Sequence, residues 1–147
     1  MIVKFYDQVE DEKLKFAVIA ARAEGKWVFC KHKARTTFEM PGGHREPGEP
    51  ILDTARRELQ EETGYHTDHV ELLTSIYTTV AFCNEKIDIY LARGLKDRGN
   101  QHLDEDELVN VEAYAVEELK QMIYDCRIQD AKTICGILTY ASKYLSE

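Results

Sequence analysis

The chain has 147 residues, of which 44% are hydrophobic and 31% are charged, and its formal net charge at pH 7 is −8. This length and composition fit one compact domain over residues 1–147, long enough to bury a real core. The acidic balance disfavours non-specific binding to a nucleic acid polymer, although it does not exclude a nucleotide held through a metal ion. No stretch has the roughly 18 consecutive apolar residues of a membrane span, so we expect no membrane contact and a cytoplasmic protein.

The chain contains four cysteines, none of them in a CxxC pair: Cys30, Cys83, Cys126 and Cys135. CxxC pairs are typical of zinc sites, and a dense, regular cysteine pattern is typical of disulfide frameworks. Because the four cysteines lie in apolar sequence contexts instead, we expect buried free thiols.

The first part of the chain predicts strands. Ile2–Tyr6 could form a short edge strand, and Leu14–Ala21 is a continuous apolar, partly β-branched run typical of a buried strand. Glu24-Gly25 is a turn signal that leads into a second strand, Trp27–Lys31. These elements predict a hairpin that delivers the chain to a glycine-rich loop.

A basic segment lies just before that loop: Lys31, His32, Lys33 and Arg35. Such side chains could hold the phosphate groups of a substrate, and the alternative is a solvated loop. Two further basic residues, His44 and Arg45, lie inside the glycine loop and leave the same two interpretations open.

The stretch Gly42–Tyr65 combines this loop with a helix. Prolines and glycines punctuate the loop, and Pro50 suits a first helical position, where its missing N–H is not needed. The pattern predicts a helix over Pro50–Thr63 that ends at Gly64 in a left-handed conformation. Its buried stripe has helical spacing: Ile51, Leu52, Ala55 and Leu59.

Three carboxylates share one flank of the predicted helix, because Glu58, Glu61 and Glu62 stand at i, i+3 and i+4. Glu62 is nearly in line with the apolar stripe, where a surface glutamate is not expected. Arg57 can pair with Glu61, but one arginine cannot neutralise three acids. Magnesium binds a few carboxylates together with substrate phosphates and water, so the helix predicts a magnesium site; the alternative is a solvated acidic face.

This arrangement resembles the Nudix box of the Nudix (MutT-like) hydrolases. The pattern runs Gly43, five residues, Glu49, seven residues, Arg57-Glu58-Leu59, one residue, Glu61-Glu62, one residue, Gly64 and a bulky residue, Tyr65. Only Tyr65 departs from the family, which usually has an aliphatic residue there. The resemblance implies an α/β fold, the Nudix α/β/α sandwich with a mixed β-sheet, and an enzyme that hydrolyses diphosphate linkages.

After the box, Val70–Thr79 and Lys86–Ala92 read as strands around a turn at 83–85. Phe82 in this connection could stack on a base, although core packing is the alternative. A polar loop, Lys96–Glu107, then leads to a strand over Val109–Ala115. Two helices follow: a short one marked by Val116, Leu119, Met122 and Ile123, and a last one from the N-cap Asp130 to Leu145.

The resemblance also assigns roles to individual residues. Mg²⁺, with Mn²⁺ as a possible substitute, is expected on Glu58, Glu61, Glu62, Glu49 and the carbonyl of Gly42. Arg57 is expected to orient the glutamates, and Gly43, Arg45, Arg35 and Phe82 are candidate substrate contacts. In the family a further glutamate outside the box often completes the metal site or acts as base; here the acidic run Asp104–Glu107 offers Glu105 or Glu107, with a solvated loop as the alternative.

Several substrates remain open. The segments Phe82–Ala92, Asp104–Glu107 and Asp130–Thr133 resemble ADP-ribose pyrophosphatases, which implies a nucleoside diphosphate linked to another moiety, such as ADP-ribose or a nucleotide sugar. The proline usual in that subfamily about sixteen residues after the box is replaced by Val80, and the N-terminus is short for the extra sheet of its dimers. MutT-like cleansing of oxidised nucleoside triphosphates is therefore the alternative. A non-catalytic nucleotide sensor and an isopentenyl-diphosphate-isomerase-like enzyme are less favoured, and a monomer or homodimer is expected.

Overall fold

The computed structural model describes residues 4, 6, 8–96, 99–103 and 109–145. Most of the predicted edge strand Ile2–Tyr6 and the acidic run at 104–107 lie outside this part. A short 3₁₀ helix, η1 (Asp11–Lys13), precedes the first strand. The strands and α-helices then follow in the order β1 (Phe16–Ala23), β2 (Lys26–His32), β3 (Gly42–His44), α1 (Ile51–Thr63), β4 (His69–Tyr77), β5 (Lys86–Arg93), β6 (Val109–Tyr114), α2 (Val116–Tyr124) and α3 (Ala131–Tyr144).

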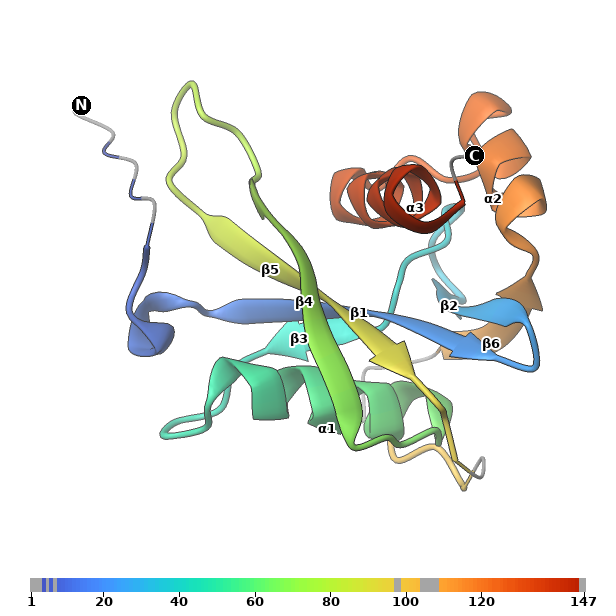
Figure 1. The fold of residues 1–147 in the computed structure, drawn as a ribbon, viewed down its shortest axis with the longest axis horizontal. Helices are drawn as coiled ribbons and strands as arrows, with labels where there is room; N and C mark the ends of the chain where they lie inside the picture. The colour runs from blue at the N-terminus through green and yellow to red at the C-terminus, as the bar shows by residue number, and fades with distance from the viewer. Residues whose placement is uncertain (1–3, 5, 7, 97–98, 104–108, 146–147) are drawn as a thin grey trace.

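Within the described residues, six strands form one mixed sheet in the order β4-β5-β1-β2-β6, with β3 beside β1. The central pair β1 and β5 is parallel, and the other pairs are antiparallel. Figure 1 shows α1 on one face of the sheet and α2 with α3 on the other. The α/β/α sandwich with a mixed sheet, which the resemblance implied, is therefore confirmed.

Strand β1 is buried on both faces, which explains its continuous apolar sequence. Alternate side chains of β1, including Ile19, pack with Ala55 and Leu59 of α1. The intervening ones, including Val18, pack in a second cluster with Ile137 of α3. Helix α1 is thus held against the middle of the sheet.

The predicted hairpin is present, with shifted ends. Glu24 and Gly25 both have positive φ, +50° and +81°, as a two-residue turn that follows the twist of the strands requires. Strand β1 begins at Phe16 rather than Leu14, because Leu14 closes η1, and it continues to Ala23.

The glycine loop was predicted without a strand, and this was wrong at Gly42–His44. These residues form β3, which pairs antiparallel with Phe16–Val18. A Cβ atom on Gly42 would lie 2.4 Å from the carbonyl oxygen of Ala17. Glycine at this position permits a close approach of two backbones, a role that turn chemistry in the sequence does not reveal.

Helix α1 has the predicted C-terminus and nearly the predicted start. Pro50 is the N-cap rather than the first helical residue, and Gly64 ends the helix with φ +75°. A remote segment covers the last turn of the helix: Gly99 N donates to Gly64 O at 2.8 Å and His102 N donates to Glu61 O at 2.9 Å. Backbone carbonyls that a helix end leaves without an intrahelical donor are satisfied in this way.

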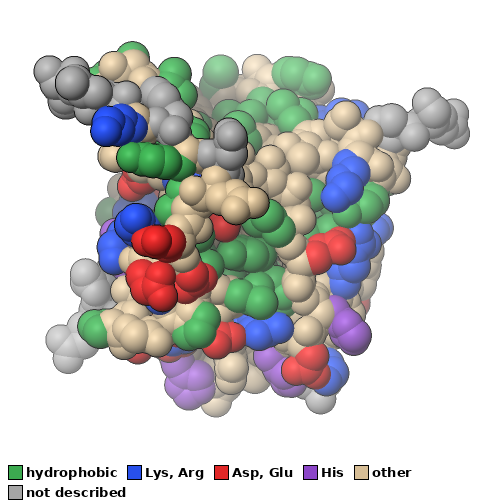
Figure 2. All heavy atoms as spheres, turned by 60° about the vertical axis from the view of Figure 1, so that its left-hand side comes forward, with side chains coloured by type: hydrophobic (Ala, Val, Ile, Leu, Met, Phe, Trp, Pro, Cys, Tyr) green, Lys and Arg blue, Asp and Glu red, His purple; other side chains and the backbone are tan. Residues whose placement is uncertain are grey.

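The cysteine expectation is confirmed only in part. None of the four cysteines is in a disulfide, but only Cys30 is buried and Cys126 is exposed. Along the described ranges, no helix combines the length and the apolar character needed to cross a membrane. Acidic and basic side chains are interspersed around a hydrophobic hollow on the face shown in Figure 2.

Gly64→Ala should destabilise the fold more than Gly48→Ala. Both glycines have positive φ, but a Cβ on Gly64 would lie 2.4 Å from the carbonyl oxygen of Gly99, whereas one on Gly48 meets nothing within 4 Å. Left-handed strain costs each variant about 1 kcal/mol, and the clash adds about 1 kcal/mol or more at position 64. Urea unfolding of both variants measures the difference; equal losses would contradict the importance of the Gly64–Gly99 contact.

Candidate active site

A pocket of about 610 Å³ opens between the glycine loop, the end of β2 and the flank of α1. It is lined by Phe16, Cys30, His32, Arg35, Glu39, Met40, Gly42, Gly43, His44, Arg45, Glu46, Pro47, Arg57, Glu58, Glu62 and Val109. The pocket therefore brings together both parts of the predicted box, the loop and the helix, and its lining contains both basic and acidic side chains.

The three helical carboxylates do not lie in equivalent places. Glu58 and Glu62 line the pocket and are 5% and 7% exposed, respectively. The side chain of Glu61 is 37% exposed and is not among the residues that line the pocket. Burying a carboxylate is costly unless it is paired, so the two buried positions indicate a site built to hold positive charge.

Arg57 contacts three of the candidate acids. Its guanidinium donates to Glu49 at 3.1 Å, to Glu58 at 2.9 Å and to Glu61 at 2.8 Å, and also to the carbonyl of His44 at 2.9 Å. Burial alone would lower the pKa of Arg57, but the hydrogen bonds to Glu49 and Glu61 and the Glu58 charge raise it above its ordinary value. Arg57 thus offsets acidic charge and fixes where the carboxylates point.

Glu49 lies behind Arg57 rather than in the lining of the pocket. Its carboxylate accepts hydrogen bonds from Arg57 and, at 2.8 Å, from the hydroxyl of Thr54. Burial alone would raise the pKa of Glu49, but these hydrogen bonds hold it below its ordinary value. Glu49 therefore joins the glycine loop to α1 through charge and hydrogen bonding.

Gly43 leaves room for the carboxylate of Glu58. A Cβ atom at position 43 would lie 2.2 Å from Oε1 of Glu58. The absence of a side chain at Gly43 therefore leaves the space that the buried Glu58 carboxylate occupies. Gly42, whose carbonyl was predicted as a metal ligand, lines the same pocket.

The donor set fits a hard divalent cation that takes some of its ligands from elsewhere. Glu58, Glu62 and the Gly42 carbonyl offer oxygen atoms in one pocket. In the part of the chain that the structure describes, no three histidine, cysteine or acidic side chains gather into a ready cation cage. Magnesium commonly completes such a partial set with water and substrate phosphate.

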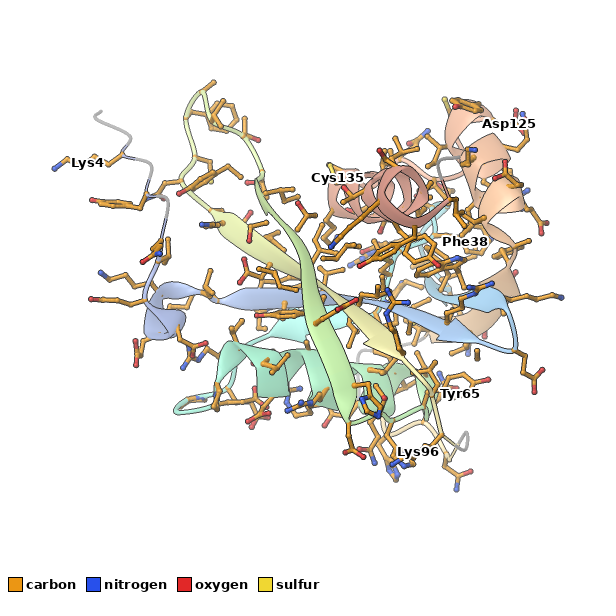
Figure 3. The ribbon with its side chains drawn as sticks, in the orientation of Figure 1. Lys4, Phe38, Tyr65, Lys96, Asp125 and Cys135 are labelled. Carbon is orange, nitrogen blue, oxygen red and sulfur yellow. The ribbon has the colours of Figure 1, made fainter. Side chains whose placement is uncertain are left out.

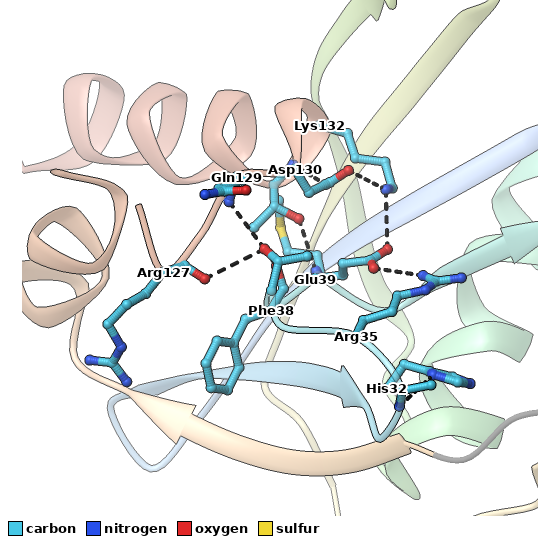
Figure 4. A network of polar contacts seen from close by, with 12 residues as sticks. His32, Arg35, Phe38, Glu39, Arg127, Gln129, Asp130 and Lys132 are labelled. Atoms are coloured by element: carbon cyan, nitrogen blue, oxygen red, sulfur yellow. Dashed lines mark hydrogen bonds and ion pairs between the residues drawn. The ribbon is translucent and has the colours of Figure 1, made fainter. Parts of the chain in front are cut away.

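The opposite wall is held by a chain of alternating charges, drawn in Figure 4. Arg35 pairs with Glu39 at 2.6 Å, Glu39 with Lys132 at 3.4 Å, and Lys132 with Asp130 at 2.6 Å. Asp130 also caps α3 by accepting from Thr133 N. Residues almost a hundred positions apart therefore fix Arg35 at the pocket.

Of the basic segment, His32 and Arg35 line the pocket, whereas Lys31 lies over the ring of Phe38. Glu39, which also lines the pocket, was missed by sequence reasoning. The sequence feature that could have revealed Glu39 is its position as a single acidic residue between the apolar residues Phe38 and Met40.

Other predicted residues lie elsewhere. Phe82 is 65% exposed on the β4–β5 connection and does not line the pocket. Glu105 and Glu107 are outside the described residues. Tyr65, the departure from the box, packs at the far end of α1 near Lys96, as Figure 3 shows.

A second pocket of about 330 Å³ adjoins the first, because both are lined by Phe16 and His44. The two rings meet edge to face, with centroids 5.0 Å apart. Beyond them the second pocket has an aliphatic side, with Ile76 and Ile87, and a charged side that includes Lys132. The rings of Phe16 and His44 therefore form part of the wall of both pockets.

The Glu49 contacts predict a pH dependence of stability. The folded state lowers the pKa of Glu49 from its ordinary value of 4.5, so the unfolded state binds the proton more readily. The stabilisation is present above pH 4.5 and is lost as the pH falls through the lower, folded pKa. Glu49→Gln should therefore flatten the acid limb of the unfolding free energy, measured by urea denaturation from neutral to acidic pH. Glu118→Gln, at an exposed position of α2, is the control; an unchanged acid limb in Glu49→Gln would refute the prediction.

Comparisons with known proteins agree with this geometry. The family model described as NUDIX domain matches residues 11–135. The chain is 40% identical over 126 residues to the methanol dehydrogenase activator of Bacillus methanolicus, covering 82% of this chain and 68% of that protein. It is 37% identical over 134 residues to the ADP-ribose pyrophosphatase of Bacillus subtilis (strain 168), covering 88% and 70%.

A solved structure described as an ADP compounds hydrolase has the same fold, with a TM-score of 0.74 over 86% of this chain and 70% of that one, at 18% identity. The family model covers most of the chain, and two relatives above 30% identity are covered over more than two thirds of their length. The chain therefore belongs to the Nudix hydrolase family, resembles its ADP-ribose pyrophosphatases, and is an enzyme of the pyrophosphohydrolase class.

Proposed function

We propose that the protein hydrolyses, with Mg²⁺, the diphosphate linkage of a nucleoside diphosphate joined to another moiety, of the ADP-ribose or nucleotide-sugar type. The observation that carries this proposal is the placement of two buried carboxylates, Glu58 and Glu62, in a pocket that also presents Arg35 and Arg45. The similarity to an enzyme named ADP-ribose pyrophosphatase supports the substrate class.

The chemistry follows from charge. A diphosphate repels an attacking water because its phosphorus atoms are surrounded by anionic oxygens. A bound divalent cation would shield those oxygens and acidify the water. Glu58, Glu62 and the Gly42 carbonyl would hold the cation, and Glu61 and Glu49 would contribute directly or through water.

The other residues of the pocket position the reacting groups. Arg57 is paired with Glu49, Glu58 and Glu61, and we assign it to orienting these acids rather than to contacting substrate. Arg35 and Arg45 would bind the diphosphate, since one guanidinium group can donate two hydrogen bonds to phosphate oxygens. The adjoining pocket gives one end of the substrate a place beyond Phe16 and His44.

Product analysis tests the substrate class. The purified protein is incubated with Mg²⁺ and with ADP-ribose, nucleotide sugars, dinucleoside polyphosphates, and ordinary and oxidised nucleoside triphosphates. We expect AMP and a sugar phosphate from ADP-ribose, or the matching products from a nucleotide sugar. Diphosphate released from a triphosphate would overturn the proposal in favour of MutT-like cleansing. Tight nucleotide binding without any product would overturn it in favour of a sensor.

Replacing either buried carboxylate by its amide should abolish most turnover. Glu58→Gln and Glu62→Gln each remove one anionic donor while keeping side-chain size, and we expect kcat to fall by about 100-fold or more. Calorimetric titration with Mn²⁺ should show weaker binding in the same variants. Glu117→Gln, at an exposed position of α2, should match the wild type in both measurements. Wild-type turnover in both buried-site variants would refute the metal assignment.

Gly43→Ala should impair the Glu58 carboxylate indirectly, by displacing it. The new methyl group would overlap the Glu58 carboxylate, and because a side-chain end can move, the fold should survive while the acid is displaced. A displacement of about 1 Å can cost about 100-fold in rate. Adding Gly43→Ala to Glu58→Gln should then lower kcat little further, since both changes act on one carboxylate; fully additive losses would contradict this account.

A further inference from the structure

Helix α1 has no side-chain cap of its own. Its N-cap residue is Pro50, whose side chain makes no capping hydrogen bond. The first amide of the helix is bonded instead by a residue forty positions away: Ile51 N donates to the two carboxylate oxygens of Asp11, at 3.2 and 3.3 Å. An anionic acceptor at this place suits both the unsatisfied amide and the positive end of the helix dipole.

Asp11 also holds the glycine loop. Its carboxylate forms an ion pair with Arg45 at 3.0 Å, and the side chain of Arg45 is only 10% exposed. The backbone carbonyl of Asp11 accepts a second contact from the same guanidinium, and Arg45 N donates to Lys15 O at 2.9 Å. The segment 11–15 is thereby fastened to the loop at several points.

These contacts join two walls of the pocket. Arg45 lines one wall, and α1 carries Glu58 and Glu62 on the other. Gly43, two residues before Arg45, is packed against the Glu58 carboxylate. Asp11 itself does not line the pocket, so it acts on the reaction only through the groups that it holds.

We propose that Asp11 is a positioning residue, which sets the place of Arg45 relative to the acids of α1. Removing it should loosen the first turn of the helix and the Arg45 guanidinium together. The kinetic part of this inference rests on the proposed function, since it requires a substrate that the enzyme turns over.

Three variants test the inference. Asp11→Ala removes both the acceptor and the charge, whereas Asp11→Asn keeps an acceptor for Ile51 but loses the ion pair. Glu12→Ala is the control, because it removes an equal charge from the neighbouring residue of η1. The contact of Glu12 with Lys15 is made by the Glu12 backbone carbonyl, which this substitution keeps. We expect Asp11→Ala to lower kcat about tenfold and to raise KM, Asp11→Asn to recover kcat more than KM, and Glu12→Ala to match the wild type.

Amide hydrogen exchange gives a measurement that does not need turnover. The Ile51 amide should exchange faster in Asp11→Ala than in the wild type, and Asp11→Asn should restore most of its protection. Wild-type kcat and KM in Asp11→Ala, or an equal loss in Glu12→Ala, would overturn the inference. A wild-type protein inert toward every substrate would count against the proposed function, and the exchange of Ile51 would then decide the role of Asp11.

Discussion

The close packing of α1 on β1 determines where the helical acids of the site, Glu58, Glu61 and Glu62, lie. Small side chains line this contact: Ala17, Ala21 and Ala55 are completely inaccessible to solvent. They let the helix lie near the sheet, as close packing of protein interiors requires. Glu58 and Glu62 flank the same buried stripe, so the packing that stabilises the helix also carries these carboxylates inward. The packing of α1 that stabilises the fold therefore also buries Glu58 and Glu62, which costs free energy.

Arg57 offsets part of the free-energy cost of burying these carboxylates. It is partly buried among Glu49, Glu58 and Glu61, and breaking such a cluster by removing one member would leave charge uncompensated in a poorly solvated place. Arg57 brings one positive charge to three carboxylates, so the cluster retains the capacity to take up further positive charge. This imbalance, rather than any single glutamate, is the physical basis for proposing a divalent cation in the pocket.

Local patterns in the sequence predicted the elements well, because helical periodicity and turn chemistry are set by neighbouring residues. The extent of α1, its left-handed end at Gly64 and the turn at Glu24-Gly25 follow from such patterns. The roles of Gly42 and of Glu39 did not follow, since each depends on a partner from another element, Ala17 for the first and Lys132 for the second. Single-sequence patterns contain no signal for these pairings.

Helix α1 is fixed at both ends by segments that are remote in sequence. Asp11 bonds its first amide, and at its last turn His102 N is bonded to the carbonyl of Glu61, while the side-chain amide of Gln101 donates to the carbonyl of Glu62 at 2.5 Å. The backbone carbonyls of Glu61 and Glu62 are therefore both hydrogen-bonded to the segment 101–102, so the positions of these two acids depend on a segment about forty residues further along the chain.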